Sequence, residues 1–332
     1  MAAPNPSSVT EIIAGVERSA QATTENGLHK LAFQAMSTHC LVSFHDAHGT
    51  TMHEIHHDIL EWVGQFEARY SRFIPDSLVS QINQAAGENW VEVDPKTELI
   101  LNQCQELFHL TQGAFDPTVL PLVQLWNWKA NPPVIPSEAA IASARELVGW
   151  NNVQRRPGKI FLPLKGMRLD LGGIGKEYAV DSVMEMLIHR NVQNALVDFG
   201  QDVRVLGHAP AKQHWLIGLE DARQPGKCWT GVAVTNHAVA SSGDYQRNFQ
   251  SNGRRYGHIL DPRTGYPAQN DVRAVSIIAS NCTLAGLLAT SACVLGAKEA
   301  LDLVEQQTDA AGAVTTDTAR LYSSKFPEFI PA

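Results

Sequence analysis

The sequence contains no long hydrophobic run. No apolar stretch approaches the roughly 18 to 20 residues that a membrane-spanning helix needs. The first residues, MAAPNPSSVTEIIAGVERSA, have neither the basic region nor the apolar core of a signal peptide, and the first cysteine is Cys40. The chain is therefore expected to be cytoplasmic and to have no membrane span.

A basic run and clustered cysteines are also missing. The 26 basic and 34 acidic residues give a formal net charge of -8. No stretch offers the positive stripe that binding to a phosphate backbone requires, so we expect no nucleic-acid partner. The five cysteines show no CxxC pair and no zinc-ligand spacing, and we interpret them as reduced thiols: Cys40, Cys104, Cys228, Cys282 and Cys293.

The hydrophobic pattern predicts one α+β domain. The chain has 332 residues, of which 44% are apolar, which is enough for a full core. Residues 1–28 are expected to form a flexible arm or a single docked helix, and residues 29–332 one domain. Helical and β-rich segments alternate without a regular βαβ order, which favours mixed, largely antiparallel sheets flanked by helices.

Individual elements can be placed along the chain. Helices are predicted near residues 55–70, 95–113, 176–189, 284–294 and 297–306 and directly after Ser137, and strands at 29–45, 195–206, 214–220, 228–235 and 272–279. The pair Asn252-Gly253 predicts a hairpin turn. Residues 113–128 are apolar but show no period, and we interpret them as a loop that forms a pocket wall.

A glycine-rich turn in front of a helix is the first candidate site. The segment LDLGGIGKEYAVD, residues 169–181, places three glycines and Lys176 at the start of the helix predicted over 176–189. The N–H groups and the positive end of a helix dipole suit an anionic phosphate, and glycines allow it to approach. The same pattern also fits glycines that serve packing alone, because neither the Walker spacing nor GxGxxG is present.

Three further segments carry polar side chains that could do chemistry. SGDYQR, residues 242–247, either brings hydroxyls and a carboxylate to a strand end or is simply a turn. In HILDPRTGYP, His258 could be a general base or a phosphate contact with Arg263 as a second cation, or it could merely be packed. Thr290 lies on a predicted helix, where its hydroxyl could also bond back to its own backbone.

Taken together, these segments resemble the ApbE family of FAD:protein FMN transferases. The resemblance runs over about residues 33–296 and is carried by AMSTHC, YSRFIPDSLVSQIN, GAFDPTVLPLVQLW, DLGGIGKEYAVD, SGDYQR and HILDPRTGYP, in that order. It implies a T-fold-like architecture and FAD bound with Mg²⁺ at its pyrophosphate. It also implies a reaction in which a threonine hydroxyl of an acceptor protein takes the FMN and AMP leaves.

The resemblance also implies roles for individual residues. Catalytic roles are implied for His258, Asp244 and Lys176, and metal ligation for the carbonyl of Gly175 and the hydroxyl of Thr290. Flavin-nucleotide contacts are implied for Met36, Ser37, Thr38, Phe73, Asp76, Phe115, Asp116, Gly172, Gly173, Lys176, Asp181, Ser242, Gly243, His258 and Arg263.

The expected metal site departs from the family pattern. The family carries Ala-Asp-x-x-x-Thr on the helix where this chain has Ala-Gly286-x-x-x-Thr290, and Glu177 replaces the glycine after Lys176. Loss of the aspartate is expected to weaken Mg²⁺ binding, with Glu177 or Asp244 as substitutes for its charge. Aspartate is a better helix former than glycine, so Gly286→Asp is expected to be tolerated and to tighten binding. Two alternatives stay open: a flavin-binding protein without catalysis, and an FAD pyrophosphatase that uses water.

Overall fold

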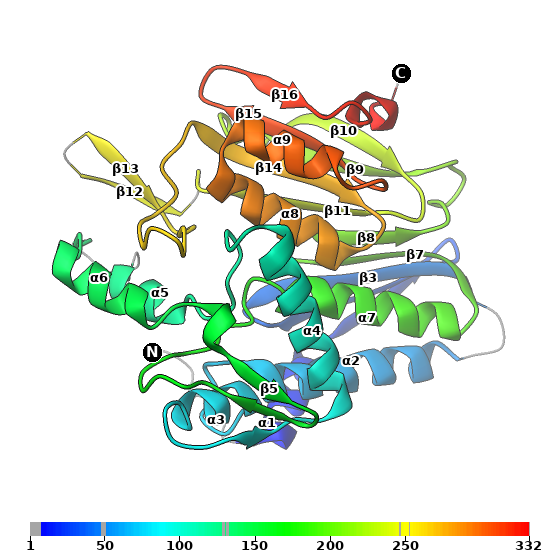
Figure 1. The fold of residues 1–332 in the computed structure, drawn as a ribbon. Helices are drawn as coiled ribbons and strands as arrows, with labels where there is room; N and C mark the ends of the chain where they lie inside the picture. Colours follow the sequence, from blue (N-terminus) through cyan, green and yellow to red (C-terminus); the bar gives the residue numbers. More distant parts are fainter. Residues whose placement is uncertain are drawn as a thin grey trace.

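The computed structural model describes residues 8–47, 51–127, 130, 133–245, 247–251 and 253–331. These residues are organised around a nine-stranded antiparallel sheet in the order β1-β2-β3-β7-β8-β11-β14-β15-β16 (Figure 1). Its strands are β1 (Gln21–Glu25), β2 (Leu28–Ala35), β3 (Thr38–Ala47), β7 (Val192–Phe199), β8 (Asp202–Leu206), β11 (Ala238–Gly243), β14 (Val272–Ala279), β15 (Ala311–Thr316) and β16 (Arg320–Tyr322). The expected α+β class with a largely antiparallel sheet is confirmed.

Helices cover one face of this sheet, the near face in Figure 1. They are α1 (Val9–Ser19), α2 (Met52–Tyr70), α7 (Gly175–His189), α8 (Cys282–Leu295) and α9 (Ala297–Glu305). Their apolar sides form the main core with the sheet, in which Val63, Val183 and Leu287 are fully buried. This layer brings α7 and α8 side by side, which positions the site described below.

A two-stranded ribbon covers part of the opposite face. It consists of β9 (Trp215–Glu220) and β10 (Cys228–Val234), which pair antiparallel. Trp215 and Val232 of the ribbon pack with Val239 of β11 and with Phe326 near the C-terminus in a second core. The centre of the sheet is therefore enclosed on both faces.

Polar caps explain where most of the helices begin. Thr51 forms a capping box at the start of α2, Asp94 caps α4 (Pro95–Leu110), and Ser137 caps α6 (Glu138–Glu146). Helix α7, like α9, begins without such a cap, because no described side chain accepts from the N–H groups after Ile174. Its first N–H groups therefore have no side-chain acceptor, as an anion site at a helix N-terminus requires.

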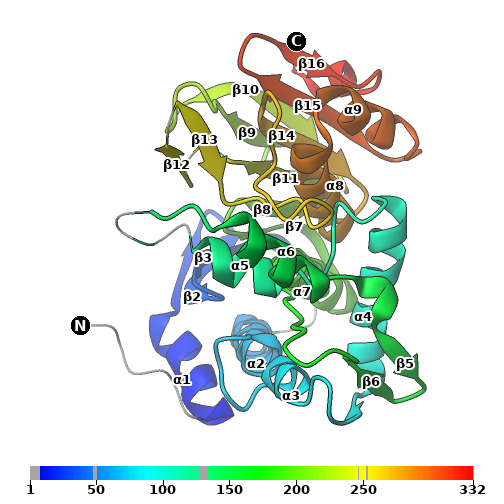
Figure 2. The same ribbon diagram turned by 60° about the vertical axis from the view of Figure 1, so that its left-hand side comes forward.

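The described residues also include smaller elements. They are α3 (Leu78–Gln84), α5 (Leu120–Trp126), β4 (Val91–Glu92), β5 (Gln154–Arg156), β6 (Lys159–Phe161), β12 (Asn248–Ser251), β13 (Arg254–Gly257) and two 3₁₀ turns, Trp150–Asn152 and Phe326–Phe329. Helix α5 and the β12–β13 hairpin lie close together (Figure 2), where Trp126 stacks on Tyr256 with ring centroids 5.7 Å apart. Within the described residues, no helix combines the length and apolar character that crossing a membrane requires.

Several segments differ from the expectations. Part of the loop predicted at 113–128 is helix α5, which is buried around much of its circumference and so shows no amphipathic period. The tail after residue 306 contributes β15 and β16 to the main sheet. Within residues 1–28, the described part forms α1 and the edge strand β1, so the docked helix is present and a strand follows it; the domain boundary at residue 28 stays a prediction. Asn252 of the expected hairpin turn and Trp128 lie outside the described residues.

Candidate active site

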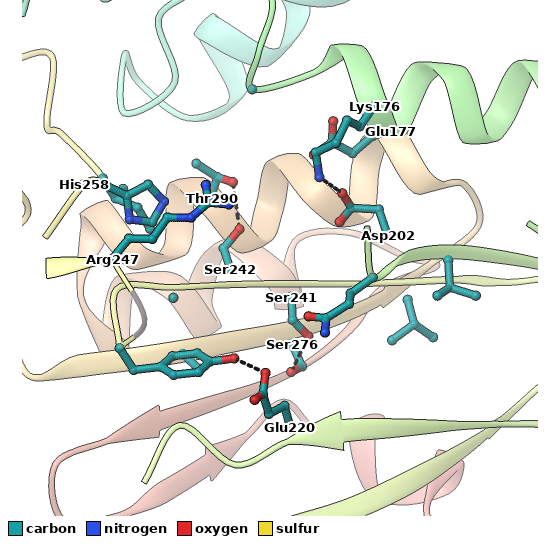
Figure 3. Close-up of a pocket in the computed structure, with 18 of the residues that line it drawn as sticks. Lys176, Glu177, Asp202, Glu220, Ser241, Ser242, Arg247, His258, Ser276 and Thr290 are labelled. Atoms are coloured by element: carbon teal, nitrogen blue, oxygen red, sulfur yellow. Dashed lines mark hydrogen bonds and ion pairs between the residues drawn. The ribbon is translucent and has the colours of Figure 1, made fainter. Parts of the chain in front are cut away.

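A cavity of about 840 Å³ opens where these layers meet (Figure 3). Its walls come from the start of α7, the turn before β8, the ends of β9 and β11, the loop after β13, and α8. This volume lies within the range of about 300–1,000 Å³ that is common for small-molecule sites. Of the residues expected to act on the nucleotide or metal, these line it: Phe115, Asp116, Gly172, Gly173, Lys176, Ser242, Gly243, His258 and Thr290.

The glycine turn forms one wall, next to the start of α7. Gly172 donates its N–H to Asp170 Oδ1 at 2.9 Å, which fixes the turn. A Cβ atom at Gly173 would lie 3.4 Å from the ring of Phe115, which shows that this aromatic side chain packs close to the turn. Backbone and ring thus approach each other beside the helix N-terminus, where a phosphate would be favoured.

Lys176 and Glu177 in the first turn of α7 form a charged group with Asp202 of β8. Lys176 Nζ makes an ion pair with Asp202 of β8 (Figure 3). Burial alone would lower the pKa of Lys176, but the charges of Asp202 and Glu177 outweigh burial and raise this pKa above its ordinary value. Burial, reinforced by the charge of Asp202, raises the pKa of Glu177 to about 7. Lys176 is therefore a fixed cation in the cavity.

Glu177 occupies the space beside Gly286. A Cβ atom at Gly286 would lie 2.5 Å from Glu177 Cγ and 2.9 Å from its Oε1, closer than real Cβ contacts. The expectation that Gly286→Asp alone would be tolerated considered only helix propensity, and it does not hold. Aspartate fits at position 286 only if the side chain of Glu177 leaves.

Hydroxyl groups line the cavity where β11 meets α8 and its neighbouring strand β14. Ser242 Oγ and Thr290 Oγ1 lie 2.9 Å apart, and Ser241 Oγ and Ser276 Oγ lie 2.8 Å apart. Thr290 therefore does not merely bond back to its own helix, because its hydroxyl meets a side chain from the sheet. These groups can donate to or accept from a polar ligand in the cavity.

His258 lies at the other end of the cavity, directly after β13. Its backbone N–H donates to the carbonyl oxygen of Arg247 at 3.0 Å. Burial, together with the nearby positive charge of Arg247, lowers the pKa of His258 to about 4. The imidazole is therefore neutral near pH 7.

Several expected site residues lie away from the cavity lining and have structural partners. Asp181 accepts hydrogen bonds from the N–H groups of Cys282 and Thr283, each at 2.8 Å. Arg263 makes two 2.9 Å contacts with the carboxylate of Asp261, in the turn after His258. Both side chains hold loops and helix ends beside the cavity.

Asp244 and Gly175 also lie outside the lining. Asp244 forms a 2.9 Å ion pair with Arg255 and packs against Gly257, whose Cβ would lie 2.7 Å from the Cβ of Asp244. Gly175 is the first residue of α7, and its N–H donates to the carbonyl oxygen of Leu171 at 2.7 Å. Asp244 thus holds the β13 end, and Gly175 begins the helix that carries Lys176.

The AMSTHC segment forms the turn between β2 and β3. Met36 and Ser37 have positive φ angles of 50° and 59°, typical of a tight hairpin turn, and Met36 N–H donates to Glu67 Oε2 at 2.9 Å. Thr38 packs against Gly200, where a Cβ atom would lie 3.1 Å from that of Thr38. This turn lies beside the β7–β8 turn that leads to Asp202, outside the cavity lining.

Phe73 and Asp76 lie in the loop between α2 and α3. The ring of Phe73 is 63% exposed, with the guanidinium of Arg72 4.1 Å from its centroid. Asp76 is exposed as well. An exposed aromatic ring next to an arginine is suited to stacking on a planar ligand.

Asp116, which does line the cavity, is engaged by its own loop. Its carboxylate accepts from Thr118 N–H at 2.7 Å, from the Thr118 hydroxyl at 2.6 Å and from Trp150 N–H at 3.0 Å. Burial raises the pKa of Asp116 despite these bonds. The residue thus shapes the loop that carries Phe115.

Sequence reasoning gave no role to several polar residues of the cavity. Arg247 extends between His258 and Thr290 in Figure 3, and the Tyr245 hydroxyl donates to Glu220 Oε2 at 2.6 Å. Arg247 was within reach of sequence analysis, since it closes the SGDYQR segment. Glu220 was not, because nothing in its strand marks it.

The oxygen donors of the cavity fit a magnesium ion. Mg²⁺ prefers oxygen ligands and is usually held by one or two carboxylates plus substrate phosphates. Glu177 and Thr290 both line the cavity, and Glu177 Oε2 is buried with no hydrogen-bond partner among the described residues. No three His, Cys, Asp or Glu side chains of the described ranges could hold a metal by themselves. The site therefore suits a Mg²⁺ ion that arrives with a phosphate ligand.

Comparison with known proteins identifies the family. Residues 36–314 match the model of the ApbE family. The chain belongs to the ApbE family. It is 30% identical to the FAD:protein FMN transferase of Haemophilus influenzae, with 77% of each chain covered, and 33% identical to that of Treponema pallidum, with 70% of this chain and 68% of the relative covered.

Solved structures of ApbE proteins share the fold. The flavin transferase ApbE from Vibrio cholerae superposes with a TM-score of 0.82 at 26% identity, covering 93% of this chain and 99% of the other. The ApbE protein from Thermotoga maritima gives a TM-score of 0.82 at 31% identity, with coverage of 94% and 100%. The ApbE-like architecture expected from the sequence is thereby confirmed.

Proposed function

We propose that this ApbE-family chain transfers FMN from FAD to a threonine of an acceptor protein and releases AMP. The observation that carries the proposal is a single cavity that joins the uncapped start of α7 and Lys176 to the neutral imidazole of His258. Phosphoryl transfer depends mainly on positioning and on stabilising charge at the phosphorus, and these groups can supply both.

The start of α7 would bind the pyrophosphate of FAD. The N–H groups of Gly173 and Lys176 would offer backbone donors, and the Lys176 side chain would supply a positive charge. Glu177 and Thr290 would hold Mg²⁺, which when bound neutralises negative charge on the phosphate oxygens. The exposed ring of Phe73 would stack on the isoalloxazine at the rim.

His258 would act on the attacking threonine. Its neutral imidazole accepts the hydroxyl proton while the threonine oxygen forms a bond to the FMN-side phosphorus. The bond between that phosphorus and the bridging oxygen breaks, and its electron pair leaves with AMP. Arg247, beside His258, would stabilise the negative charge that develops on the phosphate.

The proposal can be tested by mixing the protein with FAD, Mg²⁺ and an acceptor domain that carries the threonine. AMP is measured by chromatography and the acceptor by in-gel flavin fluorescence. AMP together with a fluorescent acceptor supports transfer. AMP alone identifies an FAD pyrophosphatase, and bound FAD with neither product identifies a flavin-binding protein. The cytoplasmic location stays a prediction, to be tested by cell fractionation.

A further inference from the structure

One oxygen of a buried carboxylate in the cavity, that of Glu177, lacks a hydrogen-bond partner among the described residues. Glu177 is 6% exposed, lines the cavity from the first turn of α7, and its Oε2 atom makes no hydrogen bond to any described residue. The adjacent cation, Lys176, makes its ion pair with Asp202. A buried carboxylate oxygen without a hydrogen bond is costly, and such atoms normally accept from a donor or coordinate a metal.

The surroundings of Glu177 direct it toward the cavity wall that carries Thr290. Its side chain fills the space beside Gly286 on α8, where a Cβ atom would lie 2.5 Å from Glu177 Cγ. Thr290 follows Gly286 by four residues, so both lie on the same face of α8, about 5–6 Å apart at Cβ. A carboxylate from α7 and a hydroxyl from α8 therefore face the same part of the cavity.

We infer that Glu177 is the carboxylate ligand of the Mg²⁺ ion in this chain, and that Gly286 is required because it makes room for the Glu177 side chain. The inference rests on the proposed function for the source of the phosphate oxygens that complete the coordination. It assigns the ligand to α7, with Gly286 and Glu177 forming one paired unit across α7 and α8.

The pairing of Glu177 with Gly286 predicts how single and double variants at these positions should bind the ion. Gly286→Asp alone forces Glu177 out of its place and brings two carboxylates into one space. Glu177→Gly alone removes the carboxylate and leaves a void beside Gly286. The double variant Glu177→Gly/Gly286→Asp moves the carboxylate to α8 and relieves the clash, so it should bind the ion as the native chain does.

Manganese binding to the full-length protein tests the inference without reference to turnover. Free Mn²⁺ is measured by electron paramagnetic resonance in titrations with FAD present. Glu177→Gln keeps the shape of the side chain and removes its charge, and it should weaken Mn²⁺ binding roughly tenfold or more. Glu185→Gln, on the exposed side of the same helix, is the matched control and should bind Mn²⁺ as the native chain does. The single variants Gly286→Asp and Glu177→Gly should each bind Mn²⁺ more weakly than the double variant Glu177→Gly/Gly286→Asp.

A thermal melt in the same buffers shows that the variants are folded. Glu177→Gln should melt no lower than the native protein without metal, because it replaces a buried carboxylate whose Oε2 has no hydrogen-bond partner among the described residues, and it should lose the rise in Tm that Mn²⁺ with FAD gives the native protein. Native-like Mn²⁺ affinity in Glu177→Gln, or a double variant no better than either single variant, would overturn the inference. If the native protein transfers FMN while Glu177→Gln binds Mn²⁺ normally, the inference fails and the function stands. If Glu177→Gln loses Mn²⁺ but the native protein forms no AMP, the function fails and the inference stands.

Discussion

The carboxylate of Asp181, on α7, holds the first turn of α8 through Thr283. It accepts hydrogen bonds from the Thr283 N–H at 2.8 Å and from the Thr283 hydroxyl at 2.7 Å. This contact fixes the two helices that bring Lys176 and Thr290 to the same cavity. Family resemblance suggests a nucleotide contact for Asp181, but its position gives it a role in orienting α8.

Asp181→Ala should therefore reduce stability more than it reduces FAD affinity. Losing bonds from a carboxylate to a helix start costs about 1–3 kcal/mol in the free energy of unfolding, measured by urea denaturation. Asp181→Asn keeps one acceptor oxygen and should lose less stability than Asp181→Ala. Native-like stability together with a large loss of FAD affinity in both variants would instead mark a direct nucleotide contact.

Removing the charge of Lys176 should destabilise the protein through the carboxylates it leaves behind. The side chain of Lys176 is 32% exposed and that of Asp202 is 7% exposed. Lys176→Met should lower the free energy of unfolding by roughly 2–4 kcal/mol. This is toward the lower end for buried ion pairs because the lysine is partly solvated. The double variant Lys176→Met/Asp202→Asn should recover much of this loss in urea denaturation. Additive losses would show that the two side chains are not coupled.

The neutral state of His258 predicts a pH dependence of stability. Burial lowers its pKa to about 4 in the folded chain, while the unfolded value is about 6.5. The folded state then binds fewer protons than the unfolded state between these values, so the contribution of His258 to stability is lost as the pH falls from about 6.5 to about 4.

His258→Gln should flatten this part of the stability curve, measured by urea denaturation at a series of pH values. An NMR titration of the imidazole should give a pKa near 4 in the folded protein. A value near 6.5, with parallel stability curves for the two proteins, would contradict the assignment of a neutral, buried base.

Phe73 should contribute to binding and not to folding. Its ring is 63% exposed, so Phe73→Ala should leave the unfolding free energy nearly unchanged. Stacking on a planar ring contributes about 1–3 kcal/mol, so the Kd for FAD should rise roughly fivefold or more. Leu99→Ala, at another exposed apolar side chain, is the matched control and should leave the Kd unchanged.

The sequence predicted the regular elements closely where one face is apolar. The helix predicted over 176–189 is α7, Gly175–His189, and the strand predicted over 272–279 is β14. Helix α5 was missed because its residues are apolar around much of the circumference and include Pro121. Strand β15 was missed because every residue in it is buried, so it shows no alternation.

The candidate site was harder to predict, because it depends on contacts between distant segments. The glycine turn, His258 and Thr290 were recognisable as motifs, and they do line one cavity. The fit of Glu177 against Gly286 joins residues on two helices, and neither residue has a local pattern that indicates the other. Only the packing of α7 on α8 reveals that Glu177 and Gly286, which both depart from the family pattern, belong together.

The most direct test of FMN transfer is the product ratio in one reaction. Intact-mass measurement of the acceptor domain is combined with quantification of AMP, and an acceptor with its threonine changed to alanine is the control. The account predicts one FMN added per AMP released on the native acceptor and no FMN on the control. AMP released without any increase in acceptor mass, or no AMP at all with FAD bound, would contradict it.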